Sequence, residues 1–148
     1  MKSAALALVV SLFLALPAQA YDPARHPAPD AQGGAYDQGR LRLQSGEWER
    51  AAAFFRQAVR ENQADHRAWT LLGYSLRHLG RLRESLAAYD EALRLNPSYA
   101  EALEYRGISH AALGNLDLAR RDLERLARLG SPLAEDLAKA IAASGRRD

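Results

Sequence analysis

The sequence predicts an all-α fold, an α–α superhelix of three helical hairpins followed by a C-terminal capping helix. Two observations support this prediction: a period of 34 residues, and apolar residues at helical spacing within each period. Five columns share the period without a gap: Gly39, Gly73 and Gly107; Gly46, Gly80 and Gly114; Trp48, Leu82 and Leu116; Ala51, Ser85 and Ala119; Phe55, Tyr89 and Leu123.

The two glycine columns have different mechanical roles. The later glycine of each unit, such as Gly80, follows the first helix and precedes the second. A left-handed residue ends a helix there, and glycine adopts that conformation without steric cost. The earlier glycine, such as Gly73, lies inside the first helix, where it costs about 1 kcal/mol relative to alanine. We expect close approach of the paired helix to offset this cost, with the small residue of the column at Ser85 as the opposite half of the contact.

The apolar spacing predicts seven helices. Leu72, Leu76 and Leu79 lie at i, i+4 and i+7, which places them on one helix face. We expect the last helix to begin at Ser131-Pro132, because serine often caps a helix and proline suits its first position. The expected helices span residues 35–45, 48–61, 66–79, 82–95, 99–113, 116–129 and 132–143, in a domain of residues 35–144 before a polar tail at 145–148.

The first twenty residues have the three parts of a secretory signal peptide: the positive Lys2, an apolar run at 4–16, and small residues for cleavage after Ala20. The run is shorter than the roughly 20 residues that cross a bilayer, so an uncleaved anchor is the less favoured alternative. Residues 21–34 contain three prolines and a Gly-Gly pair, which predict a flexible leader, either a linker or a segment that orders on a partner. We therefore expect a periplasmic or secreted protein without stable membrane insertion after cleavage.

Composition excludes several function classes. Loss of residues 1–20 would remove one of the 20 basic residues and leave one more than the 18 acidic residues, so nucleic acid is not an expected partner. The absence of cysteine excludes disulfides, thiol catalysis and cysteine-based metal sites. The four histidines show no metal-ligand spacing, and neither a phosphate loop nor a nucleophile elbow is present. We expect no catalytic residue, no metal and no cofactor.

The middle unit carries a family resemblance. The run Trp69-Thr70-Leu71-Leu72-Gly73, followed by Leu76, Gly80, Ser85, Tyr89, Ala92 and Pro97, resembles the signature of the tetratricopeptide repeat (TPR) family. The resemblance covers residues of about 32–131, with units at 32–65, 66–99 and 100–131, and the final helix resembles the one that closes such arrays. The departures are Ser85 in place of alanine, Ala35 and Gln63 in the first unit, and Arg106 and His110 in the third.

The resemblance implies a groove for a peptide or partner segment along the first helix of each unit. The implied groove residues are Tyr36, Arg40, Leu43 and Gln44; Arg67, Thr70, Tyr74, Arg77 and His78; Glu101, Glu104, Ile108, Ala111 and Ala112. The first two units thus offer arginine and tyrosine, and the third is acidic and then apolar. The family's lysine and asparagine clamp for chaperone C-termini is absent, although arginine can hold an acidic segment by bidentate bonding. The alternative is that these arginines only keep the surface soluble.

Together these features predict a non-enzymatic protein-interaction adaptor of the bacterial cell envelope. The alternative is a structural TPR protein that assembles end to end as a homo-oligomer. A small-ligand carrier or an enzyme is less favoured, because no convergent polar groups indicate one.

Overall fold

The computed structural model describes residues 33–145, and the predicted signal peptide, most of the predicted leader and residues 146–148 of the predicted tail lie outside this range. The described residues form seven α-helices and no strand, so the predicted all-α class is confirmed, and each predicted helix end is within one residue of the observed one. The helices are α1 Ala35–Gln44, α2 Trp48–Glu61, α3 His66–His78, α4 Leu82–Leu95, α5 Ala100–Ala112, α6 Leu116–Arg128 and α7 Leu133–Ser144.

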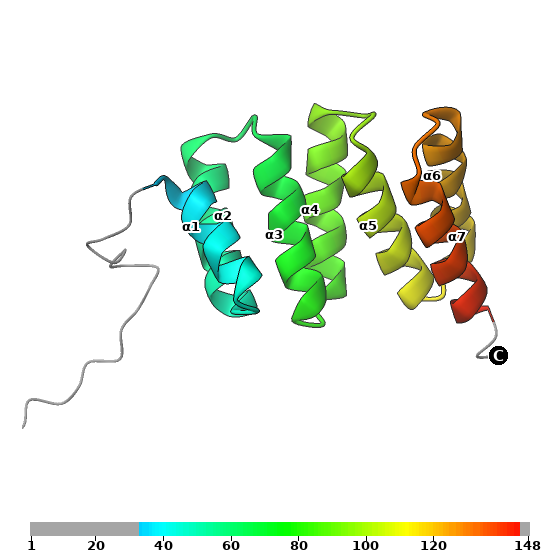
Figure 1. Cartoon of the computed structure of the whole chain (residues 1–148), viewed down its shortest axis with the longest axis horizontal. Coiled ribbons are helices and arrows are strands. Elements are labelled where there is room, and N and C mark those ends of the chain that lie inside the picture. The colour runs from blue at the N-terminus through cyan, green and yellow to red at the C-terminus, as the bar shows by residue number, and fades with distance from the viewer. Residues whose placement is uncertain (1–32, 146–148) are drawn as a thin grey trace, which may run out of the picture.

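The helices form two layers that run side by side along the molecule (Figure 1). The odd-numbered helices make the near layer in this view, and α2, α4 and α6 lie behind them. Each helix packs against the next one along the chain, and α7 packs against both α5 and α6. The first helices of the three hairpins therefore line one face of the molecule, and the second helices line the other.

Glycines close the first helix of each hairpin as the sequence predicts. Gly46, Gly80 and Gly114 have φ values of 71°, 72° and 78°, in the left-handed region. At the end of α3, Gly80 N–H donates to the Arg77 carbonyl at 2.9 Å and Arg81 N–H donates to the Leu76 carbonyl at 2.9 Å. These bonds satisfy carbonyls that the helix end would otherwise leave without a partner.

The mid-helix glycines make room for large side chains, which corrects the prediction that a small residue faces them. A Cβ on Gly73 would lie 2.6 Å from the Tyr89 ring, and one on Gly39 would lie 2.7 Å from the Phe55 ring. A Cβ on Gly107 would lie 2.5 Å from Leu137, which comes from α7. In the third unit, α7 therefore fills the space that the second helix of the hairpin fills in the others.

The core has two clusters of buried apolar residues. One joins α1, α2, α3 and part of α4, and the other joins the end of α4 to α5, α6 and α7. Trp69 of α3 packs against both clusters. The indole of Trp69 is thus the shared contact between the two halves of the core.

The third unit carries a buried ion pair where the second unit is apolar. The guanidinium of Arg106 donates through Nε to Asp122 Oδ2 at 2.9 Å and through Nη1 to Asp90 Oδ1 at 2.7 Å, and it also bonds the second oxygen of Asp122. Asp122 is 2% exposed. This network links α4, α5 and α6, which explains how the unit tolerates a charged residue at the position before Gly107.

Candidate functional site

Aromatic rings from three helices meet on the face that the odd-numbered helices line. Tyr74 of α3 lies 4.9 Å from the Tyr105 ring of α5 and 4.6 Å from the His78 ring, between centroids. His78 stacks on Trp48, the first residue of α2, at 4.0 Å and 10° between planes. A separate ring contact lies at α1, where Tyr36 meets the Phe55 ring edge to face at 6.0 Å.

Two arginines of α3 lie over these rings. The Arg77 guanidinium is 5.2 Å from the Tyr74 centroid and 5.9 Å from the Tyr105 centroid. The Arg67 guanidinium is 5.5 Å from the Tyr36 centroid. These distances are within the range of cation–π attraction, so the rings hold both cations in place. We call the set Tyr36, Trp48, Arg67, Tyr74, Arg77, His78 and Tyr105 the aromatic–arginine face.

The two arginines differ in how their charge is balanced. Arg67 pairs with Asp65 at 3.3 Å, and the same carboxylate caps α3 by accepting from the N–H groups of Arg67 and Ala68. Arg77 has no ion pair within residues 33–145, and its Nε is buried without a hydrogen-bond partner. Burial raises the pKa of Tyr89, and the guanidinium of Arg77, which lies close to the Tyr89 hydroxyl, opposes that rise. Arg77 is therefore a positioned cation that can still bind a carboxylate.

An acidic group lies at the α5 end of this region. Glu104 is 9% exposed and makes no ion pair within the described residues. Burial raises the pKa of Glu104, the nearby Asp136 of α7 adds to the rise, and Arg77 opposes it. A second carboxylate, Glu101, is exposed on the same helix and also raises the pKa. The charge along this region thus changes sign from α3 to α5.

The structure brings some of the implied groove residues together and separates others. The structure brings Tyr36 into contact with Arg67. It also brings Tyr74 into contact with Arg77 and His78. Arg40 is exposed on α1, and Ile108 is half-buried and packs against the C-terminal core cluster.

Thr70 requires a correction to the implied groove. It is 1% exposed, and its hydroxyl donates to the His66 carbonyl at 2.8 Å, so the side chain is not available to a partner.

Sequence reasoning missed three aromatic residues at this site. Trp48 was assigned only to the start of a helix, and Tyr105 and Tyr99 are not among the positions that the resemblance implies. Tyr99 meets His66 edge to face at 4.6 Å, and burial raises the pKa of Tyr99 to about 12. The available signal for Tyr105 was its position one turn after Glu101 on the first helix of a unit.

Two other kinds of feature are absent from the part of the chain that the structure describes. They contain no group of three or more His, Cys, Asp or Glu side chains that can hold a metal ion. None of the helices α1 to α7 is long and apolar enough to cross a membrane.

Comparison with known proteins identifies the family. A tetratricopeptide repeat sequence model matches residues 36–84, and a second, TPR repeat, matches residues 73–114. The two matches together cover residues 36–114, more than half of the 148 residues. The chain belongs to the tetratricopeptide repeat family.

Two curated relatives match at the level of sequence. Protein FlbA of Caulobacter vibrioides is 38% identical over 71 residues, which are 47% of this chain and 12% of that protein. The peroxisomal targeting signal receptor of Candida glabrata is 33% identical over 76 residues, 51% of this chain and 13% of the receptor. The chain therefore spans about an eighth of the length of the curated relatives that it matches.

Solved TPR domains share the fold. The first TPR domain of Spaghetti (RPAP3), bound to the HSP90 peptide SRMEEVD, superposes with a TM-score of 0.68 at 22% identity, covering 74% of this chain and 89% of that one. The TPR2B domain of yeast Sti1, in a complex with pHsp70, gives 0.70 at 14% identity, covering 77% and 95%.

Proposed function

We propose that this chain is a non-enzymatic adaptor that binds an acidic segment of a partner protein on the aromatic–arginine face. The observation that carries the proposal is Arg77, a cation fixed over two tyrosine rings with no ion pair in residues 33–145. Arg77 is half-buried, and an arginine without an ion pair can donate hydrogen bonds to both oxygens of a carboxylate. Tyrosine and arginine are also the side chains that carry much of the energy at binding hot spots.

The rings around Arg77 supply the rest of the contact. Tyr74 and Tyr105 offer area for an apolar or aromatic side chain next to the bound carboxylate. Arg67 lies about 15 Å from Arg77 along α3, because the two residues are ten positions apart in a helix. A second carboxylate of an extended segment, four to five residues away, can therefore reach Arg67.

Two relatives support the use of a TPR domain for this purpose. The RPAP3 domain is bound to a peptide with the sequence SRMEEVD, and the Sti1 domain is in a complex with pHsp70. The first peptide contains three carboxylate side chains in seven residues. An acidic partner for this chain is consistent with that chemistry. The cations that would bind it here are the arginines of the aromatic–arginine face and not the lysines of the family's clamp.

The place of action that we propose is the bacterial cell envelope, because residues 1–20 have the pattern of a cleaved signal peptide. N-terminal sequencing of the protein from a periplasmic extract tests this. A mature chain that begins at Tyr21 is expected. A chain that keeps Met1 and sediments with membranes would instead indicate an uncleaved anchor.

Binding tests the adaptor role directly. We expect proteins captured from an envelope extract by the wild type to be lost with Arg77→Ala and reduced with Tyr74→Ala and Arg40→Ala. Arg121→Ala is the matched control, because Arg121 is an exposed arginine of α6 on the opposite layer. Equal capture by wild type and Arg77→Ala would rule out this face as the binding site.

A captured acidic segment then gives a quantitative test. Its affinity should fall about tenfold with Arg77→Ala and about threefold with Arg77→Lys, because lysine keeps the charge but loses bidentate bonding. The loss should shrink at high salt, since screening weakens the pair.

A further inference from the structure

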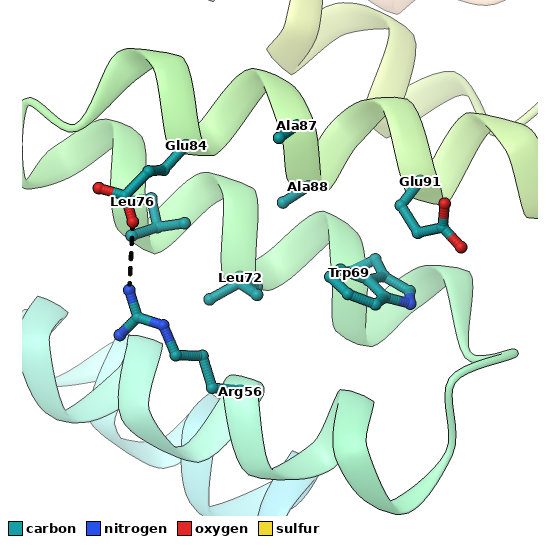
Figure 2. Close-up of a pocket in the computed structure, with 8 residues that line it drawn as sticks. All are labelled: Arg56, Trp69, Leu72, Leu76, Glu84, Ala87, Ala88 and Glu91. Atoms are coloured by element: carbon teal, nitrogen blue, oxygen red, sulfur yellow. Dashed lines mark ion pairs between the residues drawn. The ribbon is translucent and has the colours of Figure 1, made fainter.

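The opposite layer of the molecule contains a pocket between α2 and α4. Its volume is 520 Å³. The floor is formed by Trp69, Leu72 and Leu76 of α3, and Ala87 and Ala88 form one wall (Figure 2). Cavities of this volume with an apolar lining and a few polar groups at the rim are typical of binding sites.

The rim of the pocket is charged and uneven. Arg56 of α2 reaches across to Glu84 of α4 at 3.7 Å and closes one end, as the dashed line in Figure 2 shows. Glu84 also receives two hydrogen bonds from Arg81, so its charge is balanced. At the other end, Glu91 lies near the indole of Trp69 (Figure 2).

Glu91 is held by one arginine, whereas Glu84 is held by two. Arg94 donates through Nε to Glu91 Oε2 at 2.9 Å and through Nη2 to Glu91 Oε1 at 2.5 Å. This pair lies at the surface, because the Arg94 side chain is 66% exposed and the Glu91 side chain is 32% exposed. Exposed ion pairs of this kind contribute little and exchange easily. A cation from a partner can therefore replace Arg94 at Glu91, and the face of Trp69 would attract the same cation.

The next step of the repeat shows that the apolar lining of this pocket is not a general property of the fold. A cavity of 410 Å³ lies between α4 and α6, and all of its lining residues are 34 positions after residues that line the first pocket. There Arg106, His110 and Asp122 occupy the positions of Leu72, Leu76 and Ala88. The buried ion pair of Arg106 and Asp122 fills that site with charge. Only the α2–α4 pocket offers an apolar floor, although both were formed by the same fold.

We propose that the α2–α4 pocket is a second docking site, for an amphipathic helix of a partner protein. The helix places a bulky apolar side chain on Leu72 and Ala88 and a lysine or arginine, one turn away, against Glu91 and Trp69. One turn of spacing follows from α4 itself, because Glu91 lies three residues from Ala88 and four from Ala87. The carboxylate of Glu91 and the ring of Trp69 favour a basic side chain at this end of the pocket, whereas the aromatic–arginine face selects an acidic segment, so the two sites bind different partner chemistry.

Two tryptophans make the sites separately observable. The chain has two Trp residues, and Trp48 lies in the aromatic–arginine face while Trp69 lines the pocket. In the Trp48→Phe variant, indole fluorescence reports only on the pocket. In Trp69→Phe, it reports only on the opposite face.

The probe is a pair of designed helical peptides of about 16 residues, a length at which helices become stable enough to study. Both carry the same leucine stripe, and one has lysine and the other glutamate one turn from the central leucine. With Trp48→Phe we expect saturable quenching by the lysine peptide, and at least about fivefold weaker binding of the glutamate peptide.

Matched variants locate the binding. Ala87→Arg gives the exposed wall of the pocket an arginine, which is the residue found 34 positions later as Arg121. This variant should lower the affinity for the lysine peptide by about tenfold. Glu91→Gln should remove the preference for lysine over glutamate. Arg121→Ala, in the equivalent cavity, should change affinity by less than about twofold. Ala87 is exposed on a helix, so its substitution is not expected to disturb folding.

The outcomes separate the two proposals. Equal binding of both peptides, unchanged binding with Ala87→Arg, or quenching of Trp48 instead of Trp69 would overturn the second site. A dimer in sedimentation that Ala87→Arg dissociates would also overturn it, by assigning the pocket to a second copy. Loss of acidic-segment binding with an intact response of Trp69 would remove the proposed function and leave the pocket standing.

Discussion

Glu104 and Arg77 are opposite charges on adjacent hairpins, and neither forms an ion pair within residues 33–145. The two charges differ in how much they destabilise the folded protein when no partner is bound. Arg77 gains from the rings of Tyr74 and Tyr105, which attract a cation. The charged form of Glu104 is disfavoured by burial and by a second carboxylate, Asp136, and the attraction of Arg77 is weaker than these effects. A buried carboxylate without a partner is expected to destabilise the folded state at neutral pH.

A pH-dependent stability difference follows for Glu104. Its pKa is raised in the folded protein, so its contribution to stability is present when the carboxyl is protonated and is lost as pH rises through the folded pKa. We expect Glu104→Gln to raise the melting temperature by a few degrees at pH 7 and to have little effect below about pH 4. Thermal unfolding at both pH values measures this. Glu101→Gln, at an exposed position of the same helix, is the control.

A lower melting temperature for Glu104→Gln at pH 7 would contradict this account. It would mean that the charged carboxylate is paired in solution, with Arg77 as its nearest opposite charge.

At the scale of elements, the α5–α6 contact depends on Arg106 and Asp122. Their side chains are 17% and 3% exposed, so both charges are largely removed from water. Breaking such a pair leaves one buried charge without a partner, which costs several kcal/mol, whereas replacing both by apolar residues is often neutral. The second unit shows the apolar solution, with Leu72 and Ala88 at the equivalent positions.

The pair predicts that the effects of the two substitutions on the free energy of unfolding are strongly non-additive. Asp122→Ala alone should reduce the free energy of unfolding by about 3 kcal/mol, because it leaves the largely buried Arg106 with only the exposed carboxylate of Asp90 as a partner. The double variant Arg106→Leu with Asp122→Ala should be within about 1 kcal/mol of the wild type. Urea denaturation of the wild type, both single variants and the double variant measures the coupling. Additive losses would show that the two charges do not act as a unit.

At the scale of the whole molecule, α7 does more than cover the end of the array, because it supplies part of the core of the third unit. Leu137 of α7 is fully buried against Gly107, where the first two units use Phe55 and Tyr89 from their own second helix. The two core clusters share contacts through Trp69, so damage to one cluster is expected to reach the other mainly through that residue.

Removal of α7 should therefore have a graded effect. In a chain that stops at Ser131, amide hydrogen exchange should accelerate strongly in α5 and α6 and only slightly in α1 to α3, because repeat arrays lose structure from an end. Leu137→Ala should show the same order of effects with a smaller loss, about 3 kcal/mol for a fully buried leucine. Equal loss of protection in all helices would show that the repeats unfold as a single unit.

Most of the fold could be predicted from the sequence, and the candidate site only in part. The 34-residue period, the glycines and Ser131-Pro132 are local signals, and they placed every helix end within one residue. The predicted neighbour of each mid-helix glycine was wrong, because the atoms nearest to a Cβ at these glycines belong to Phe55, Tyr89 and Leu137 and not to residues 51, 85 and 119. The contacts of Trp48 and Tyr105 were missed for the same reason: a position in a repeat does not say which ring of another helix it will meet.

The sequence alone determined the repeat, the helix ends and the charge of each unit, because those properties depend on residues close together in the chain. Tertiary structure decided which charges have partners. Within residues 33–145, it leaves Arg77 without an ion pair over two rings, neutralises Arg106 with Asp90 and Asp122, and opens an apolar pocket beside Trp69 but not at the equivalent site one repeat later. The physical reason is that pairing and burial depend on distances between helices, which side chains from several units set together.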